Sequence, residues 1–360
     1  MVREGLQHGL QLYDSGALNN LSISENALTR FDALATARRV EDELERTGRG
    51  FGTLSRDAAL ENIKGAIAGR LGDYQGVIEL WRRDRGFNLE GRAVNVRTLL
   101  GRDLVADHDV TAGLKLSDPT SEGLLSFSGV NYGLYSDRMK AALALRDWPG
   151  VVTMGEKAFS LAASDARTRQ FAFREEAAIL AAGYARVGRL ADARAMLART
   201  LLDCEPCLAA RGWVAELAGD RAGADRWFAA FERADPEIPL PDAEWAQALL
   251  ERGDMDRAIA QARQAHLKGP HYAEPMETWG DALMAKGDYA GAAEKFAQAD
   301  RDAPRWGRNH MRWGEALMLS GHYSEARAQF VAASGMDLSR SDLAALNVLL
   351  RRTASGRLHG

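Results

Sequence analysis

Two cysteines separated by two residues have a spacing that could carry chemistry. Cys204 and Cys207, within "LLDCEPCLAA", are the only cysteines among the 360 residues. A Cys-x-x-Cys pair can exchange a disulfide or supply half of a zinc site. A zinc site needs two more ligands, and the seven histidines show no metal-ligand spacing near the pair. A redox motif of this kind belongs between a strand and a helix, and no strand is predicted nearby. The sequence therefore favours a pair without a chemical role at a turn between helices, and leaves thiol exchange open.

Three histidines are the next candidates for chemistry. His108 lies between two aspartates in "VADHDV". Neighbours in sequence do not share a helix face, and the segment falls at the turn of a degenerate repeat, so we expect a solvated turn rather than an acid–base pair. His266 and His271 bracket "HLKGPH", for which a surface turn is favoured over a metal site.

Motifs of known catalytic mechanisms are absent from the sequence. It contains no Gly-x-Ser-x-Gly elbow, no His-Glu-x-x-His and no glycine-lysine phosphate loop. The glycines of residues 48–52 follow a predicted helix, whereas a dinucleotide-binding motif follows a strand. We therefore expect no enzyme within these residues, no cofactor and no bound metal.

A 34-residue interval organises the second half of the chain. Glycine, alanine and tryptophan each recur at this interval, and proline ends three of the units. The glycines are Gly219, Gly253, Gly287 and Gly321; the alanines Ala224, Ala258, Ala292 and Ala326; the tryptophans Trp245, Trp279 and Trp313; the prolines Pro236, Pro270 and Pro304. One register for four residue types over successive units predicts a structural repeat.

Each unit is predicted to form two antiparallel helices. Before the glycine, a segment such as "METWGDALMAK" has apolar residues at three- and four-residue spacing, which is typical of an amphipathic helix. The glycine ends this helix, because it adopts the left-handed backbone without strain. Small alanines such as Ala292 let the second helix approach the first, and Phe296 fills the space between units. One such hairpin cannot cover its own apolar faces, so the units must stack.

The unit resembles the tetratricopeptide repeat. Matching positions are Gly280, Leu283, Gly287, Tyr289, Ala292, Phe296, Ala299 and Pro304, then Gly314, Leu317, Gly321, Tyr323, Ala326, Phe330 and Ala333. The tryptophans depart from the family pattern, because Trp279 and Trp313 directly precede a glycine, while Met276 and His310 stand where the large aromatic residue is usual. The resemblance implies an all-α fold, a right-handed superhelical α-solenoid of stacked antiparallel helix pairs.

The strength of the repeat divides the chain into four parts. Residues 1–57 are expected to hold a degenerate repeat and a long helix over 22–49, residues 58–173 degenerate repeats, and residues 174–338 well-matched repeats. Residues 339–360 are expected to form a capping helix and tail. Two interruptions are predicted, a turn-rich loop at 117–131 and a lengthened connection at 162–173.

The resemblance also implies where a partner would bind. In tetratricopeptide proteins the first helices of successive units line a concave groove, in which peptides often lie. The corresponding positions here are Gln247, Glu277, Asp281, Met284, Arg308, Met311, Glu315 and Met318. These residues are mainly acidic and sulfur-containing, and methionine adapts to varied apolar partners. We therefore expect a protein or peptide partner with basic and apolar residues, bound by a scaffold or adaptor. The alternative is a regulatory arm that senses an effector or forms a dimer.

Charge and hydropathy complete the expectations. The net charge of −4 provides no general attraction to nucleic acid or to anionic membranes. No apolar run approaches the roughly 18 residues that a membrane span needs. The start "MVREGLQHGLQLYDSG" is amphipathic and lacks the order of a signal peptide, so a cytoplasmic location is expected. Because this start resembles the middle of a helical hairpin, we expect the chain to be part of a longer protein.

Overall fold

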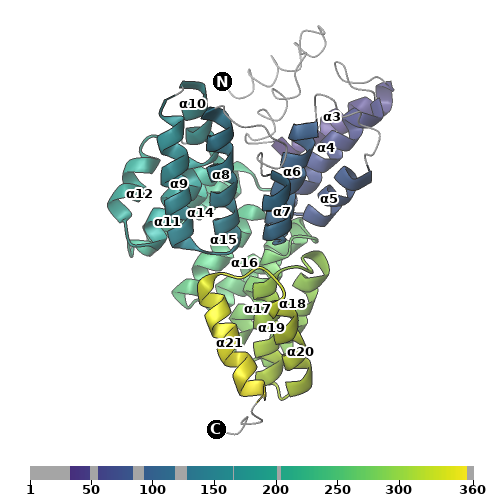
Figure 1. Cartoon of the computed structure of the whole chain (residues 1–360), viewed down its shortest axis with the longest axis vertical. Helices are drawn as coiled ribbons and strands as arrows, with labels where there is room; N and C mark the ends of the chain where they lie inside the picture. The colour runs from purple at the N-terminus through teal and green to yellow at the C-terminus, as the bar shows by residue number, and fades with distance from the viewer. Residues whose placement is uncertain are drawn as a thin grey trace.

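The computed structural model describes residues 33–48, 56–83, 93–117, 128–164, 166–200 and 204–354. Within these ranges every regular element is an α-helix, and most helices pair as antiparallel hairpins (Figure 1). The hairpins are α4(Arg56–Arg70) with α5(Tyr74–Arg83), α6(Ala93–Ala106) with α7(Val110–Ser117), α8(Ser128–Ala144) with α9(Trp148–Ala162), α11(Ala177–Arg186) with α12(Leu190–Leu197), α13(Glu205–Leu217) with α14(Arg221–Ala234), α15(Leu240–Arg252) with α16(Met255–Lys268), α17(Glu274–Lys286) with α18(Tyr289–Asp302), and α19(Gly307–Leu319) with α20(Tyr323–Ser334). The predicted all-α solenoid of stacked helix pairs is confirmed.

Each hairpin turn contains one residue with left-handed backbone. Six turns use glycine, as at Gly287 with φ 81°. The α6–α7 and α8–α9 turns instead use His108 and Arg146, with φ 66° and 54°. An aspartate often follows and begins the second helix, as Asp288 does by accepting a hydrogen bond from the backbone N–H of Gly291. The sequence pattern Gly-Asp therefore ends one helix and starts the next.

A glycine in the first helix receives a phenylalanine of the second helix in three hairpins. The pairs are Gly212 with Phe228, Gly280 with Phe296, and Gly314 with Phe330. A Cβ atom added at Gly280 would lie 2.6 Å from the Phe296 ring, so no larger residue fits without movement. In the α15–α16 hairpin the same two places hold Ala246 and Ala262, both fully buried. The first helix thus carries a methyl group at this place where the second helix has alanine instead of phenylalanine.

Three helices lie outside the hairpins. In the predicted long helix, α3(Ala33–Thr47) ends before Gly48, whose φ is 66°. Residues 22–32 of that helix lie outside the described ranges, as do residues 1–21, where the degenerate first repeat is expected. The predicted lengthened connection at 162–173 lies between α9 and α11, and α10(Ala166–Glu175) fills most of it. The C-terminal α21(Arg340–Ala354) packs on α19 and α20 through Leu346 and Leu349, as expected for a cap. Of the helices described, none is both long and apolar enough to cross a lipid bilayer.

The solenoid turns back on itself. Figure 1 shows α6 and α7 beside α8, and α7 next to the C-terminal hairpins. Thr111, at the start of α7, donates its backbone N–H to Asp337 at 2.8 Å and its hydroxyl to the same carboxylate at 2.5 Å. The Gly72 turn lies against the ring of Tyr272, and the His108 ring stacks on Trp306 at 3.9 Å between centroids. These contacts hold the early hairpins against the late ones.

Candidate functional site

A cleft of about 490 Å³ lies where the first helices of successive hairpins converge. We call it the central cleft. Its walls come mainly from α6, α8, α11, α13, α15 and α17, with additional residues from α5, the start of α9 and the start of α19. Its aromatic lining consists of Tyr74, Trp148, Trp213, Tyr272 and Trp306. The predicted use of first helices to form a concave surface therefore agrees with the geometry.

One arginine is held between two aromatic rings of the cleft wall. The guanidinium carbon of Arg186 lies 4.9 Å from the ring centroid of Trp148 and 4.1 Å from that of Trp213. Its Nη1 also forms an ion pair with Glu251 at 2.5 Å. Cation–π contacts and the carboxylate together fix this side chain. Arg186 is therefore part of the wall and holds α9, α11, α13 and α15 in register.

The other basic residues of the cleft also have carboxylate partners within the chain. Arg102 pairs with Asp137 at 3.0 Å, Lys140 with Glu176 at 3.4 Å, and Arg146 with Glu277 at 2.8 Å. Burial lowers the pKa of Lys140 despite its carboxylate neighbours. These four cations are thus already compensated and leave little free positive charge in the cleft.

Two carboxylates of the cleft are not compensated in this way. Within the described ranges, no lysine or arginine forms an ion pair with Glu244 or Glu274. Glu244 accepts a hydrogen bond of 2.5 Å from the indole Nε1 of Trp213, and burial raises its pKa. Glu274 Oε1 lies 3.3 Å from Nε2 of His108. The cleft therefore combines aromatic walls with surplus acidic groups.

His108 lines the central cleft and is not a solvated turn. Only 7% of its surface is exposed, and its ring stacks on Trp306 with an interplanar angle of 1°. The expected solvated turn is therefore wrong, because the sequence neighbourhood does not reveal a stacking partner 198 residues away. The neighbouring Asp107 is also buried, and burial with the charge of Glu274 raises its pKa to about 8.

The predicted groove acids form an internal ion network. Glu277 is fully buried and accepts 2.8 Å hydrogen bonds from Arg146 and from Arg308. Asp281 pairs with Arg312 at 2.6 Å, and Arg312 also bonds Glu315. Burial would raise the pKa of Glu277, but the two guanidinium groups outweigh it and lower the pKa to about 2.

This network joins distant hairpins. Arg146 belongs to the α8–α9 turn, Glu277 to α17 and Arg308 to α19. Arg308 also reaches Asp342 of α21 at 3.2 Å. Much of the acidity expected in the groove is thus neutralised inside the protein.

The predicted methionines lie in the hydrophobic core. Met311 and Met318 are 4% and 8% exposed and pack with Phe330 and α21, while Met284 packs near Phe296. Of the eight predicted groove residues, Gln247 lines the central cleft. There it accepts a hydrogen bond from Thr278 and donates one to Glu251. Partner binding by any of the eight stays a prediction.

Comparisons with known proteins give similarities of structure. No protein-family model matches the chain, and no curated protein matches it. Among solved structures it resembles the Cut9–Hcn1 hetero-tetramer of the APC/C, with a TM-score of 0.47 and 15% identity over 88% of this chain and 59% of that one. It also resembles yeast Tom70, with a TM-score of 0.44 and 12% identity over 98% and 80% of the two chains. A tetratricopeptide repeat protein from Parabacteroides merdae has a TM-score of 0.44 and 15% identity over 73% of this chain and all of that one.

The chain thus spans about three fifths of the length of the first of these relatives. The turn glycines, the 34-residue interval and the stacked hairpins decide its architecture. The fold is a tetratricopeptide-like α-solenoid.

The two cysteines of the solenoid form a disulfide at the start of α13. Cys204 is the N-cap residue of this helix, and Cys207 lies in its first turn. The two cysteines do lie at a turn between helices, as predicted. Their sulfurs, however, are joined by a covalent bond. Within the described ranges no group of three or more histidine, cysteine or acidic residues is arranged to hold a metal ion.

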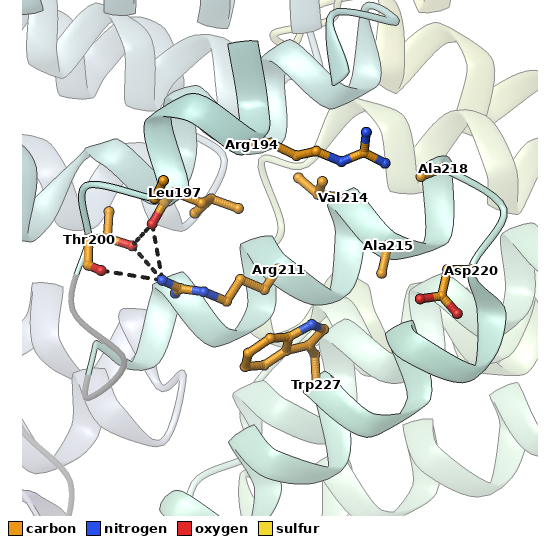
Figure 2. Close-up of a pocket in the computed structure, with 10 residues that line it drawn as sticks. Arg194, Leu197, Thr200, Arg211, Val214, Ala215, Ala218, Asp220 and Trp227 are labelled. Carbon is orange, nitrogen blue, oxygen red and sulfur yellow. Dashed lines mark hydrogen bonds between the residues drawn. The ribbon is translucent and has the colours of Figure 1, made fainter. Parts of the chain in front are cut away.

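A second pocket of the solenoid lies beside α12, α13 and α14 and has a volume of about 470 Å³. The second helix beside it, α12, has 8 residues, whereas α14 has 14. Figure 2 shows Arg211 extending to the end of α12, where it donates hydrogen bonds to the carbonyl of Leu197 and to Thr200. The one signal of this pocket in the sequence is the short spacing between "ADARAML" and "DCEPC".

Proposed function

We propose that the solenoid is a non-catalytic interaction scaffold whose central cleft binds a protein segment. The segment carries a basic side chain beside apolar or aromatic residues. The observation that carries the proposal is the surplus of Glu244 and Glu274 in a cleft whose own lysine and arginines already have carboxylate partners. A cationic side chain of the partner would supply the missing charge.

The aromatic lining supports the apolar part of this partner. Trp213, Trp306 and Tyr272 are each less than 9% exposed, so they offer firm surfaces rather than mobile ones. Tryptophan and tyrosine bury large areas at a low cost in conformational entropy. A basic group near them would also gain from cation–π attraction. The walls of the cleft are formed by helices. A cleft of about 490 Å³ favours an extended segment over a folded domain.

The proposal is tested with defined fluorescent peptides. A set of peptides with one lysine or arginine among apolar residues is compared with matched peptides carrying glutamate instead, and binding is measured by anisotropy. We expect the basic set to bind, and the Glu244→Gln/Glu274→Gln variant to bind about tenfold more weakly or worse, because each lost charge-assisted contact is worth about 1.5–3 kcal/mol.

The matched control changes two exposed acids away from the cleft. Asp256→Asn/Glu294→Gln removes the same charge from side chains that are 83% and 69% exposed. This variant should bind as the wild type does. Preference for acidic peptides, or equal weakening by both variants, would contradict the assignment of the cleft.

A sensing arm is the second candidate function, and the stacking of His108 on Trp306 in the cleft wall favours it. His108 and Trp306 stack across hairpins that are distant in sequence, so a small cation bound beside Glu274 would contact both sides of the closure. Calorimetry with small organic ammonium ions separates the two candidates. Binding of such ions without binding of peptides would support the sensing arm.

A further inference from the structure

The disulfide of α13 occupies the position where a helix begins. The backbone N–H groups of Cys207 and Leu208 both donate to the carbonyl of Cys204, at 3.0 and 3.1 Å. Cys207 is fully buried, whereas Cys204 is partly exposed. One sulfur is therefore accessible to a reactant, and the other is shielded.

One of the two residues between the cysteines connects α13 to another part of the solenoid. Glu205 is 2% exposed and accepts two hydrogen bonds from Arg70 of α4, at 2.6 and 2.9 Å. Arg70 also pairs with Asp235, the C-cap residue of α14. The guanidinium thus holds α4 against both helices of the α13–α14 hairpin.

The far side of the cysteine turn is also anchored. Arg211 donates through Nη1 to the carbonyl of Cys207 at 3.1 Å, and through Nη2 to Leu197 and Thr200 at the end of α12 (Figure 2). The first turn of α13 therefore lies between two arginine contacts. A change in this turn would act on α4 through Glu205.

We propose that Cys204–Cys207 is a thiol–disulfide exchange site, open to an external dithiol at Cys204, whose oxidation state sets how firmly α4 docks on α13. The inference does not depend on what the central cleft binds. A cysteine at a helix N-terminus in a Cys-x-x-Cys pair is the kind whose thiolate is stabilised, because the helix dipole and free N–H groups favour negative charge there.

The exchange is a two-electron reduction by a dithiol. A thiolate of the reductant attacks the sulfur of Cys204, the bond to Cys207 breaks, and the Cys207 sulfur leaves as a thiolate and takes a proton. The second thiol of the reductant gives up its proton and attacks the reductant's own sulfur in the mixed disulfide. Cys204 is released as a thiolate and takes a proton, while the reductant departs as its disulfide.

The bond constrains the backbone that presents Glu205. In the oxidised state a ring of four residues fixes the N-cap and the first turn of α13. Reduction opens this ring, and the helix start can fray, since terminal turns are the least stable part of a helix. The carboxylate of Glu205 then holds Arg70 less firmly, and α4 docks more weakly.

The exchange itself is tested on the full chain without denaturant. The protein is equilibrated in buffers of reduced and oxidised dithiothreitol and quenched with acid. Only after the quench is it denatured and alkylated, so that the buried Cys207 is also labelled, and the labelled cysteines are counted by mass spectrometry. We expect both thiols to be labelled in reducing buffer and neither in oxidising buffer, with full reversal. Reduction that requires unfolding, or thiols that never oxidise, would overturn the proposal.

The coupling to α4 is tested by amide hydrogen exchange in the two states. Amides of residues 56–70 should exchange severalfold faster in the reduced protein, while α17–α20 remain unchanged. In the Cys204→Ser/Cys207→Ser variant, amides of residues 56–70 should exchange as fast as in the reduced wild type, and dithiothreitol should not change their rate. Equal exchange of 56–70 in both states would overturn the coupling.

Arg70→Gln separates the coupling from a general loosening of the protein. This variant keeps both cysteines, so its disulfide should still form and break. Exchange over residues 56–70 should be fast in both of its states, because the link from Glu205 to α4 is gone. If the oxidation state still changed the exchange of α4 in this variant, the coupling would not depend on the Glu205–Arg70 contact.

Discussion

Glu277 joins three helical hairpins through one carboxylate. Arg146 from the third hairpin and Arg308 from the eighth each donate to it at 2.8 Å, and no part of it is exposed. A buried pair of this kind is costly to break, because removal of one partner leaves the other charges without compensation. At the scale of single residues, the stability of the solenoid is thus most sensitive to substitution of its buried charged side chains.

The first prediction concerns Glu277→Gln. We expect a loss of about 3–5 kcal/mol in the free energy of unfolding at pH 7, because Arg146 and Arg308 lose their shared carboxylate. Denaturant unfolding measures the loss. Because the pKa of Glu277 is lowered from 4.5 to about 2 on folding, its stabilisation is fully present above pH 4.5 and disappears as pH falls through 2. The gap between the wild type and the variant should narrow over this pH range, and a constant gap would contradict the charge-based account.

A second prediction concerns Asp107→Asn. Burial and the charge of Glu274 raise the pKa of Asp107 from 3.8 to about 8. The wild type therefore loses stability as pH rises from 3.8 towards 8, since the folded state must then accommodate an unfavourable carboxylate. The asparagine variant should be more stable by roughly 2–4 kcal/mol at pH 8 and equal to the wild type near pH 4. Denaturant unfolding at both pH values measures this, and a variant less stable at pH 8 would contradict it.

Helix pairs are held together by complementary volumes. The Gly280–Phe296 and Gly314–Phe330 pairs place a ring directly on the backbone of the first helix, and the Ala246–Ala262 pair divides the volume differently. Interiors are closely packed, so each arrangement is disturbed by a change of even one methyl group. At the scale of elements, the residue that fits at one of these two positions therefore depends on the residue at the other.

A double-mutant cycle tests this complementarity. Gly280→Ala should cost about 1–3 kcal/mol through overpacking, and Phe296→Ala about 3–5 kcal/mol through the cavity it leaves. The double variant reproduces the alanine pair of α15–α16, so its loss should be smaller than the sum by at least about 1 kcal/mol. The control combines Gly280→Ala with Phe330→Ala of the next hairpin. That pair should be additive, and additivity in both cycles would refute the idea.

Local features of these elements could be predicted from sequence, and distant contacts could not. Gly287 ends a helix and Ala292 is fully buried, as the 34-residue interval predicts, because each depends on its own hairpin. Glu277 was expected in the groove, but its partner Arg146 lies 131 residues away. The stacking of His108 on Trp306 is likewise invisible to the repeat pattern. The sequence thus predicts the hairpin well and the charges of the cleft poorly. Which carboxylates remain without a basic partner depends on contacts between hairpins that are distant in sequence.

The whole molecule depends on contacts between its early and late hairpins. Thr111–Asp337, His108–Trp306 and the Gly72 turn against Tyr272 link segments roughly 200 residues apart. Tetratricopeptide-like hairpins contact mainly their neighbours, so an open solenoid unfolds in parts. Closure adds long-range contacts and should make unfolding more cooperative.

The fourth prediction uses His108→Gly/Asp337→Ala. His108 has φ 66°, so glycine keeps the turn and relieves strain, while two of the closing contacts, His108–Trp306 and Thr111–Asp337, are removed. We expect unchanged helicity by circular dichroism and a larger radius of gyration by X-ray scattering. His322→Gly/Asp256→Ala, at exposed positions, is the matched control and should leave both unchanged. A radius of gyration equal to that of the wild type would show that these contacts do not hold the closure.

Closure also limits how the number of repeats can change. An open solenoid can gain or lose one 34-residue unit, because only the two neighbouring interfaces must be rebuilt. Here the α8–α9 turn must meet α17 through Arg146 and Glu277, and α7 must meet Asp337. Removal of one repeat unit between these contacting segments would rotate and shift every later hairpin. The contacts of Arg146 with Glu277 and of α7 with Asp337 would then no longer form. The copy number is therefore fixed by geometry, and duplication of a hairpin should be tolerated outside the closed span, before α3 or after α21, rather than within it.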